Sequence, residues 1–316
     1  MSEDIERVLV TGGAGFIGSH LVDRLLASGH QVVVLDDFSS GKRENIAQHT
    51  GDARLLVIEA DVAGDLDAAL DTAHAASPIT RVAHLAAKVS VVASLEDPLE
   101  DLRVNAGGTL RVLEWARRHA VRKVAFASSA AVYGDVAEVP TPERAPCAPI
   151  SPYGIHKRSS ERYLALYAEV HGLPTTSLRF LNVFGPRQDA SSPYSGVISI
   201  FFERARAGLP LTVYGDGEQT RDFVYVADVT DALERALFSS PDVVGPLNVG
   251  TGVGTSVNQL AAAVLEVLGA QLEVRHDEAR GGEIRHSCAV VDAAAQQLGF
   301  HAGYELKRGL AEMIDV

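Results

Sequence analysis

A serine, a tyrosine and a lysine in the middle of the chain have the types and spacing for acid–base chemistry. Ser129 ends an apolar run, Tyr153 follows 24 residues later, and Lys157 comes four residues after the tyrosine. Positions i and i+4 share one face of a helix, so Tyr153 and Lys157 would stand side by side. A neighbouring ammonium favours the phenolate, which can take a proton from a substrate hydroxyl. Ser129 would hold the same oxygen through a hydrogen bond.

The spacing of the tyrosine and the lysine also has a structural explanation. Tyr-x-x-x-Lys is common in amphipathic helices, where the tyrosine is half buried and the lysine extends into solvent. The catalytic interpretation therefore depends on the elements around the pair. His156 lies near the same helix face, but no other residue in the sequence recruits it. We therefore interpret His156 as a solvated helix residue.

A glycine-rich turn near the start of the chain is the first of these elements. Residues 8–19 read Val-Leu-Val-Thr-Gly-Gly-Ala-Gly-Phe-Ile-Gly-Ser. The first residues predict a buried strand, which a turn connects to a helix expected over residues 15–28. Gly12 and Gly15 suit a turn whose backbone approaches a ligand, and Gly18 lets the helix lie close to the strand. The helix start directs unpaired N–H groups into the turn, which suits a pyrophosphate. A tight turn needs glycine even without a ligand, so this motif alone is weak.

The second strand, expected over residues 31–35, strengthens the interpretation as a dinucleotide site because it ends at Asp36 and Asp37. A carboxylate here accepts hydrogen bonds from ribose hydroxyls and repels a 2'-phosphate, which favours NAD over NADP. A loop carboxylate or a helix cap is the alternative role of Asp36. The residues that follow, where an adenosine ribose would lie, are Phe38, Ser39, Ser40 and Gly41.

Two later strand ends extend the same site. Asp61 and Val62 follow a strand expected over residues 55–58, and Asp61 is placed to reach the adenine amino group. Asp61 can also cap a helix expected over residues 64–76, and the two roles are compatible. Ala86 and Ala87 follow a strand expected over residues 81–85, and their small side chains let the backbone pass close to a cofactor.

Strands and helices keep alternating up to residue 180. Further strands are expected over residues 123–127 and 176–180, and helices over residues 99–119 and 151–171. This alternation predicts an α/β fold, a doubly wound parallel sheet with helices on both faces. Ligands of such sheets lie at the carboxyl ends of the strands, where the candidate residues gather.

Beyond residue 180 the alternation loosens, because proline and glycine interrupt the chain. We expect a smaller mixed α/β substrate-binding lobe. One helix is expected over residues 226–238, a strand over 247–249, and C-terminal helices over 256–268, 293–298 and 306–314. The predicted domains are an NAD-binding domain of residues 1–180, to which 226–250 return, and a nucleotide-sugar-binding lobe of 181–225 and 251–316.

The composition limits the classes of partner. The 316 residues are 47% apolar, enough for a sizeable core, and carry a net charge of -13. An acidic chain without a basic cluster is a poor match to nucleic acid. Two cysteines far apart, with no ligand spacing to the histidines, indicate reduced thiols and no metal site. The charged N-terminus and the lack of a long apolar run indicate no membrane anchor and a cytoplasmic protein.

Four motifs in this order resemble those of the extended short-chain dehydrogenase/reductases, in particular the nucleotide-sugar epimerases and dehydratases. They are Thr-Gly-Gly-Ala-Gly-Phe-Ile-Gly, Ser-Ser-Ala-Ala-Val-Tyr-Gly, Tyr-Gly-Ile-His-Lys and Arg-Asp-Phe-Val-Tyr-Val. The resemblance covers essentially the whole chain. It implies a Rossmann-like fold, a tightly bound NAD that is reduced and reoxidised within one turnover, and a UDP-sugar substrate. It also implies a homodimer that pairs through the helices expected at residues 99–119 and 151–171.

The resemblance assigns roles to residues of the second lobe. Asn182 would contact the diphosphate, and Arg221 and Arg280 would clamp it, a task that suits the planar fork of arginine. As isolated residues, these arginines are more often surface cations. Thr212 and Tyr214 would frame the uracil, with Glu283 near the uridine ribose. The cofactor set also includes Phe16, Ile17, Leu85, Lys88, Asn105, Tyr153 and Lys157, and the substrate set includes Lys88, Ser129, Tyr153, Val197 and Ser287.

Two positions bear on the reaction. Dehydratases of the family carry an acid pair directly after the strand-end serine or threonine, and the decarboxylases resemble them in keeping a glutamate there. This chain has Ala130 and Ala131. The resemblance therefore implies C4 epimerisation by transient oxidation to a 4-keto sugar. The alternatives are a net oxidoreductase, a 3,5-epimerase/reductase or dehydratase of the same fold, and a non-catalytic NAD-sensing protein.

Two further positions bear on the sugar. Ser287 stands where 4-epimerases restricted to glucose and galactose carry a bulky aromatic residue. A small residue leaves room for a 2-acetamido group, which favours UDP-GlcNAc and UDP-GalNAc over UDP-glucose and UDP-galactose. Ser287 can also merely fill space or bond to the backbone. Lys88 departs from the neutral polar residue expected in its loop, and the sequence gives no reason for it.

Overall fold

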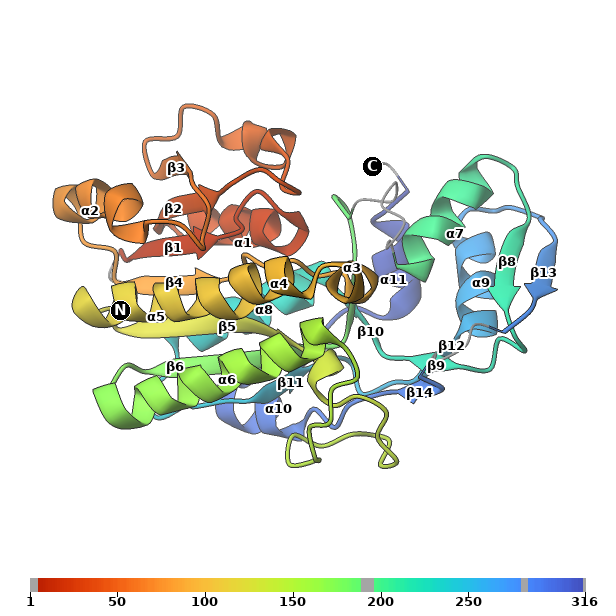
Figure 1. Ribbon diagram of the computed structural model, residues 1–316. Helices are drawn as coiled ribbons and strands as arrows, with labels where there is room; N and C mark the ends of the chain where they lie inside the picture. Colours follow the sequence, from red (N-terminus) through yellow and green to blue (C-terminus); the bar gives the residue numbers. More distant parts are fainter. Residues whose placement is uncertain (1–4, 189–195, 280–283, 315–316) are drawn as a thin grey trace.

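A seven-stranded parallel sheet forms the centre of the molecule, with the strand order β11-β6-β5-β4-β1-β2-β3 (Figure 1). The computed structural model describes residues 5–188, 196–279 and 284–314. The order is that of a doubly wound, Rossmann-like sheet with one added strand, which confirms the predicted fold class. The strands are β1 (Arg7–Thr11), β2 (Gln31–Asp36), β3 (Leu55–Glu59), β4 (Arg81–His84), β5 (Lys123–Ser129), β6 (Thr175–Phe180) and β11 (Leu247–Val249).

Helices cover both faces of this sheet. Side chains alternate along each strand, so Val8 and Val10 of β1 join one core while Leu9 joins the core on the other face. The first face is covered by α1 (Phe16–Ala27), α8 (Val226–Phe238) and α10 (Asp292–Leu298). The second face is covered by α2 (Leu66–Ala76), α5 (Gly108–Arg118) and α6 (Pro152–His171).

A smaller lobe stands beside the carboxyl ends of the strands, at the right of Figure 1. Its own apolar core includes Phe201, Phe202, Leu211 and Leu260, all buried. The helices are α7 (Val197–Arg206), α9 (Val257–Val267) and α11 (Leu306–Ala311). The short strands are β7 (Asn182–Phe184), β8 (Leu211–Tyr214), β9 (Thr220–Arg221), β10 (Phe223–Tyr225), β12 (Thr255–Ser256), β13 (Val274–Asp277) and β14 (His286–Ser287).

The helical stretch predicted over residues 99–119 is present at residues 98–118, but it is not α-helical throughout. The structure divides this stretch into α4 (Pro98–Asp101), a π-helical turn η2 (Leu102–Gly107) and α5. Such turns insert a residue into an α-helix and change the direction of the side chains, often at functional sites. A further short helix, α3 (Val91–Glu96), precedes α4, and 3-10 turns occur at η1 (Arg43–His49) and η3 (Ala130–Val132).

The second lobe contains more regular structure than the sequence predicted. Helix α7 was missed, although Ile198, Phe201 and Ala205 lie on one buried face at helical spacing. Strands β9, β12 and β14 have only two residues each, so they depend on pairing across the lobe rather than on a local pattern. No helix in the described ranges has the length and apolar character needed to cross a bilayer.

Candidate active site

The candidate residues of the first domain meet at the point where the order of the strands reverses, between β1 and β4. Strand β1 pairs in parallel with β2 on one side and with β4 on the other. In doubly wound sheets, ligands bind outside the carboxyl ends of the strands at this point. Thr11 at the end of β1 lies opposite His84 of β4, and His84 lies opposite Phe126 of β5, the strand that ends at Ser129.

The glycine turn has the close contacts that its sequence predicts. Gly12 has φ +69°, and a Cβ there would lie 2.8 Å from the backbone nitrogen of Ala86. A Cβ on Gly18 would lie 2.0 Å from the carbonyl oxygen of Gly12, so both positions require glycine. Helix α1 has Gly15 as its N-cap and no side-chain hydrogen bond there. Its first N–H groups, near Phe16 and Ile17, can therefore receive an anion.

Asp36 is buried beside this turn. Its carboxylate accepts hydrogen bonds from the backbone N–H groups of Ala14 and Phe38, both at 2.9 Å. Burial raises the pKa of Asp36, while these two bonds lower it. A Cβ on Gly41 would lie 2.8 Å from Asp36 Oδ1, so the loop passes directly over the carboxylate. Asp36 thus braces the turn and caps no helix.

The residues after Asp36 are more open. Asp37 is exposed and accepts hydrogen bonds from the backbone nitrogen and the hydroxyl of Ser39, at 2.9 and 2.7 Å. Ser40 is exposed, and Phe38 is half buried with φ +56°. The polar side chains of Asp37, Ser39 and Ser40 therefore lie on the outer side of the turn, next to the buried carboxylate of Asp36.

Asp61 does not cap helix α2, contrary to one of its two expected roles. Asp65 is the N-cap, and its side chain accepts from the backbone nitrogen of Ala68. Asp61 instead accepts from Ala63 N at 2.8 Å and from Arg103 Nη1 at 2.6 Å. Asp61 precedes the buried Val62. Burial acts to raise the pKa of Asp61, but the bond from Ala63 and the charges of Arg103 and Lys88 lower it overall.

The loop after β4 is held by hydrogen bonds on both sides. The hydroxyl of Thr11 accepts from Leu85 N and Ala86 N, each at 3.2 Å, and Ala87 follows. Asn105, in the π-helical turn, accepts from Lys88 N at 2.8 Å and donates to Lys88 O at 2.9 Å. The Lys88 side chain itself is exposed. The structure thus explains the fixed backbone at this position but gives no reason for the lysine.

Ser129 and Tyr153 lie together because helix α6 begins close to the end of β5. A Cβ on Gly154 would lie 2.6 Å from the carbonyl oxygen of Ala131, so the first turn of α6 packs directly against the turn after Ser129. Ser151 caps the helix by accepting from Gly154 N at 3.1 Å. Tyr153 is buried, and Ser129 lies close enough to lower the pKa of its phenol.

Lys157 is buried but does not contact the tyrosine oxygen. Its Nζ donates to the carbonyl oxygen of Ala127 at 2.7 Å and lies 5.8 Å from the centroid of the Tyr153 ring. Burial lowers the pKa of Lys157 to about 8 and raises that of Tyr153 to about 12. Burial is the largest influence on the phenol, so the positive charge expected to favour the phenolate would have to offset it.

His156 is not the solvated helix residue that the sequence predicted. Its Nδ1 lies 2.5 Å from Oδ1 of Asp101, a buried carboxylate on α4. Asp101 also accepts from Asn105 Nδ2 at 2.9 Å. The interpretation was wrong because the partner lies 55 residues earlier in the sequence. The sequence contained a weak signal that Asp101 has polar partners, since it precedes Asn105 by one helical turn.

Sequence reasoning also missed a buried histidine close to Lys157. His84 hydrogen-bonds Thr11 through Nδ1 at 2.8 Å and Thr109 through Nε2 at 3.0 Å. Burial, with a contribution from Lys157, lowers the pKa of His84 to about 3, so the ring is neutral. It therefore links β1, β4 and α5 without carrying charge.

The predicted substrate residues of the second lobe lie in separate groups. Thr212 and Tyr214 lie on β8, and Asn182 begins β7, where its Nδ2 donates to Asp222 O at 3.3 Å. Arg221 of β9 lies directly opposite Ser287 of β14. Val197 is the first residue of α7, whereas Arg280 and Glu283 lie outside the described residues.

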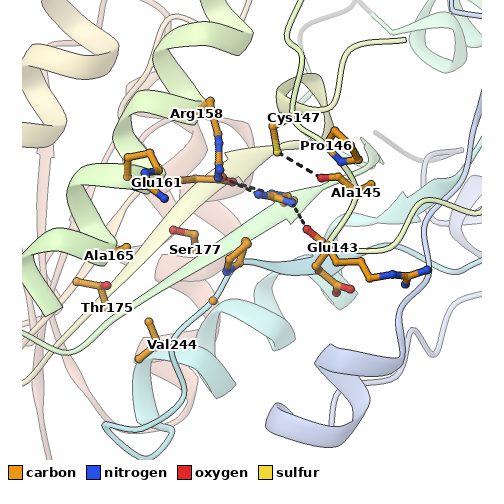
Figure 2. Close-up of a pocket in the computed structure, with 15 residues that line it drawn as sticks. Glu143, Ala145, Pro146, Cys147, Arg158, Glu161, Ala165, Thr175, Ser177 and Val244 are labelled. Carbon is orange, nitrogen blue, oxygen red and sulfur yellow. Dashed lines mark hydrogen bonds and ion pairs between the residues drawn. The ribbon is translucent and has the colours of Figure 1, made fainter. Parts of the chain in front are cut away.

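Two cavities lie near these elements. A hollow of about 360 Å³ connects the loop of residues 135–139, which follows Ser129, with residues of β9 and β14, the strands of Arg221 and Ser287. A second cavity of about 400 Å³ lies between α6, β6 and the loops of residues 143–147 and 244–246, and none of the predicted site residues line it (Figure 2). Its inner wall is the ion pair of Glu161 with Arg179, and Glu161 also accepts from Ser128 Oγ at 2.7 Å.

Comparison with known proteins identifies the family. The NAD dependent epimerase/dehydratase family matches residues 8–250 of the chain. A UDP-glucose 4-epimerase of Mycolicibacterium smegmatis is 42% identical over 98% of this chain and 97% of its own length. The chain belongs to the NAD-dependent epimerase/dehydratase family.

Solved structures of other epimerases resemble this family member over nearly the whole chain. The UDP-N-acetylglucosamine 4-epimerase from Methanobrevibacter ruminantium, in complex with UDP-N-acetylmuramic acid, has a TM-score of 0.92 at 35% identity. The match covers 99% of this chain and 98% of that one. The UDP-glucose 4-epimerase of Thermus thermophilus, in complex with NAD, has a TM-score of 0.86 at 40% identity and covers 98% of both chains.

The first domain of this epimerase/dehydratase family member fits an NAD molecule. The turn at Gly12 leaves no room for a Cβ, the start of α1 has no side-chain cap, and a carboxylate stands at the end of β2. A pyrophosphate suits the first two features, and an unphosphorylated ribose suits the third. The donor set of the structure therefore agrees with the cofactor that the family name states.

Proposed function

We propose that this protein is a UDP-sugar 4-epimerase that works with a tightly bound NAD. The observation that carries the proposal is the burial of Tyr153 beside Ser129, where the first turn of α6 packs against the end of β5. Lys157 lies one helical turn further along. The similarity to 4-epimerases over nearly the whole chain supports this assignment.

The side chains of the site divide the chemistry as follows. Bound NAD would accept a hydride from C4 of the sugar and return it to the opposite face. Tyr153 is the general base that takes the proton of the 4-hydroxyl and later gives it back. Ser129 holds the same oxygen through its hydroxyl. Lys157 supplies positive charge close to the phenol, which favours proton loss from Tyr153.

The residues after Ser129 support epimerisation over elimination. Ala130 and Ala131 form the η3 turn and carry no group that could give or take a proton. The expulsion of water from the sugar needs such a group, whereas oxidation, rotation of the ketone and reduction do not. A net oxidoreductase or a dehydratase of the same fold is therefore less well supported.

For the sugar, we propose UDP-GlcNAc and UDP-GalNAc. Ser287 lies opposite Arg221 across β14 and β9, which puts a small side chain beside a proposed phosphate-binding residue. A serine leaves space for a 2-acetamido group. UDP-glucose and UDP-galactose are the second candidate pair, because a relative at 42% identity is named a UDP-glucose 4-epimerase.

The wider assignments follow from the same proposal. Residues 1–180 and 226–250 would bind the dinucleotide, because α8 packs against the central sheet and β11 is its edge strand. Residues 181–225 and 251–316 would bind the nucleotide sugar. The cofactor residues would be Gly12, Gly15, Phe16, Ile17, Asp36, Asp37, Phe38, Ser39, Ser40, Gly41, Asp61, Val62, Leu85, Ala86, Ala87, Lys88 and Asn105. The substrate residues would be Lys88, Ser129, Asn182, Val197, Thr212, Tyr214, Arg221, Arg280, Glu283 and Ser287.

We also propose that the protein is a homodimer. Helices α3, α4 and α6 and the η2 turn lie side by side on one side of the molecule (Figure 1). Together they expose several large apolar side chains. Exposed apolar area of this kind marks protein interfaces. The exposed residues are Val91, Val92, Leu95, Leu99, Leu102, Ile155, Tyr163, Leu166 and Val170.

One experiment tests the reaction, the sugar and the retention of the cofactor. The purified protein is incubated, without added NAD, with UDP-GlcNAc, UDP-GalNAc, UDP-glucose or UDP-galactose, and the products are separated. We expect interconversion of the acetylated pair without net accumulation of NADH. Steady accumulation of NADH absorbance would indicate a net oxidoreductase instead. Interconversion of the plain pair alone would favour the second candidate.

A further inference from the structure

A buried chain of hydrogen bonds links the catalytic helix to the loop proposed to hold the cofactor. His156, on α6, donates from Nδ1 to Asp101 Oδ1 at 2.5 Å, because an ionised carboxylate only accepts. Asp101 Oδ2 accepts from Asn105 Nδ2 at 2.9 Å. Asn105 in turn bonds both the N–H and the carbonyl oxygen of Lys88. The chain therefore runs from α6 through α4 and η2 into the loop after β4.

The burial of Asp101 destabilises the fold, which indicates that this carboxylate has a functional role. The Asp101 side chain is 2% exposed, and His156 is 12% exposed. A carboxylate removed from water is destabilising by several kcal/mol unless hydrogen bonds and charge compensate it. An apolar side chain would serve as well if the contact only packed α4 against α6. The π-helical turn brings Asn105 within reach of Asp101, although its geometry is less regular than that of an α-helix.

The negative charge of Asp101 also acts on the catalytic pair. Asp101 raises the pKa of Lys157 against the larger effect of burial, and it raises that of Tyr153 in addition to burial. Glu161 acts on Lys157 in the same direction. Glu161, however, forms ion pairs with Arg158 and Arg179, which offset much of its charge. Asp101 therefore has the more direct influence.

Other charged and titratable groups face this region. Glu100 and Arg103 form an exposed ion pair beside Asp101. His84 of β4 is neutral because burial lowers its pKa to about 3. The other charged or titratable groups on these elements are Lys88 in the loop, Glu96 and Asp97 near α3, Arg111, Glu114, Arg117 and Arg118 on α5, and Arg162, Tyr163, Tyr167, Glu169 and His171 on α6.

We propose that Asp101 and His156 are positioning residues for the epimerase reaction. His156 fixes the Asp101 carboxylate, which orients Asn105 and the loop at Lys88 and places a negative charge toward Lys157. The proposal rests on the proposed function for its role in catalysis. Its physical content, a charge on Lys157 and a fixed loop, is measured independently of turnover.

The charge is tested by nuclear magnetic resonance of the protein with labelled lysine side chains. The chain has only five lysines, so each Nζ signal can be assigned by substitution and titrated with pH. Asp101→Asn keeps the shape of the side chain and removes its charge. We expect the titration midpoint of Lys157 to fall by about one pH unit in this variant. The matched control is Glu100→Gln, which removes an exposed carboxylate one residue away.

Lys123 is an internal control in the same spectra. It is buried at the start of β5, bonded to the carbonyl oxygens of Ser240 and Val243, and burial lowers its pKa to about 8. A midpoint of Lys157 that is unchanged in Asp101→Asn would overturn the proposal. A shift of Lys123 as large as that of Lys157 would do the same, because it would indicate a general change in structure.

The orientation is tested by hydrogen exchange of the Lys88 amide, whose acceptor is Asn105 Oδ1. We expect exchange to be about tenfold faster in His156→Ala, because local opening becomes easier once Asp101 is released. His156→Asn restores a side-chain N–H donor and should return exchange to the wild-type rate. Unchanged exchange in His156→Ala, or no rescue by His156→Asn, would contradict the proposal. Asp101→Asn keeps one of the two acceptor oxygens and the size of the side chain, and it remains informative if His156→Ala does not fold.

Turnover measurements then separate this proposal from the proposed function. In an active enzyme, Asp101→Asn should lower kcat while leaving KM for the UDP-sugar close to the wild-type value, since neither residue contacts the sugar. A wild-type protein without epimerase activity would defeat the proposed function. The lysine titration and the amide exchange would still decide whether Asp101 and His156 position the site.

Discussion

Lys157 donates its hydrogen bond to the carbonyl oxygen of Ala127, in the strand that carries Ser129, at 2.7 Å. The bond directs the ammonium along β5, so that Nζ lies 5.8 Å from the centroid of the Tyr153 ring. Burial then acts on both side chains in the direction of their neutral forms, with a pKa of about 8 for Lys157 and about 12 for Tyr153. Tyr153 can therefore serve as the base only when positive charge beside the phenol offsets the effect of burial, which is the role proposed for Lys157.

The first prediction concerns the phenol itself. Tyr153→Phe removes the proposed base and keeps the ring that packs at the start of α6. We expect kcat to fall by about 10²–10⁴-fold, the usual contribution of a positioned acid–base group. The NAD released on heat denaturation should stay at the wild-type amount. A variant that retains a tenth or more of the wild-type kcat would exclude Tyr153 as the base.

The second prediction concerns stability and Lys157. Its pKa lies at about 8 in the folded chain against an ordinary 10.5, so the unfolded chain binds more protons between these values. The charged lysine therefore destabilises the fold below pH 8 by about 3 kcal/mol, and this cost disappears as the pH rises toward 10.5. Lys157→Met also loses the bond to Ala127, worth about 1 kcal/mol.

We therefore expect Lys157→Met to be more stable than the wild type by about 2 kcal/mol at pH 7, although inactive. The advantage should shrink steadily between pH 8 and pH 10.5. Urea unfolding at several pH values measures both effects. Lys42→Met, at an exposed position, is the control and should show no such trend. A wild type that is more stable than Lys157→Met at pH 7 would contradict the prediction.

The third prediction concerns the ion pair behind the catalytic strand. Arg179 donates to both oxygens of Glu161 at 2.8 Å, and both side chains are almost fully buried. Removal of one partner from a buried pair leaves an uncompensated charge and costs about 3–5 kcal/mol. We expect that loss in the free energy of unfolding of Glu161→Ala. The double variant Glu161→Leu with Arg179→Met should recover much of it.

The pH dependence gives an independent check on this pair. Hydrogen bonds and the charge of Arg179 lower the pKa of Glu161 despite its burial. The pair therefore stabilises the fold above pH 4.5, the ordinary value, and this stabilisation is lost as the pH falls through the lower folded value. The difference in stability between the wild type and Glu161→Gln should shrink over the same acid range. A constant difference would contradict this assignment.

The sheet and the proximity of Ser129, Tyr153 and Lys157 could be predicted because their signals are local. The glycine turn, the acid after β2 and the Tyr-x-x-x-Lys spacing each lie within one strand–turn–helix unit, where sequence spacing sets geometry. The pair of Asp101 and His156 could not be predicted in this way, because it depends on how α4 packs against α6. The same holds for the pKa of Tyr153, since the sequence shows the neighbouring lysine but not the burial.

The second lobe marks the limit more clearly. Ser287 and Arg221 become neighbours only through the pairing of two-residue strands, which no local pattern indicates. Helix α7 is different, because its apolar positions 198, 201, 202 and 205 carry a helical period that was available in the sequence. It was missed because proline, serine and glycine before residue 197 suggested a loop.

The fourth prediction concerns the sugar. Ser287→Tyr places a bulky aromatic side chain opposite Arg221, where a 2-acetamido group is proposed to fit. We expect kcat/KM for UDP-GlcNAc to fall by about 10–200-fold, while that for UDP-glucose changes little. The control is Ser287→Ala, which keeps the space and should keep the preference. Equal losses on both substrates would show that position 287 does not select the sugar.

The fifth prediction concerns the apolar surface of α3, α4 and α6. Leu99 is 77% exposed on α4, although leucine is usually buried. A second copy of the chain that covers this surface would remove such side chains from water, at about 25 cal/mol for each Å² of apolar area. We therefore expect sedimentation equilibrium to show a dimer for the wild type. Leu99→Arg would place a desolvated charge in the interface and should shift the equilibrium to monomer.

The control for this substitution uses an exposed apolar residue elsewhere on the surface. Val253 is 61% exposed in the turn between β11 and β12, in the second lobe. Val253→Arg adds the same charge and should leave the dimer intact. Leu99 lies two residues before Asp101, so dimer dissociation should also speed exchange of the Lys88 amide if the interface supports α4. A Leu99→Arg protein that remains dimeric would show that the copies pair through another face, because an arginine at the centre of this one could not be accommodated without loss of affinity.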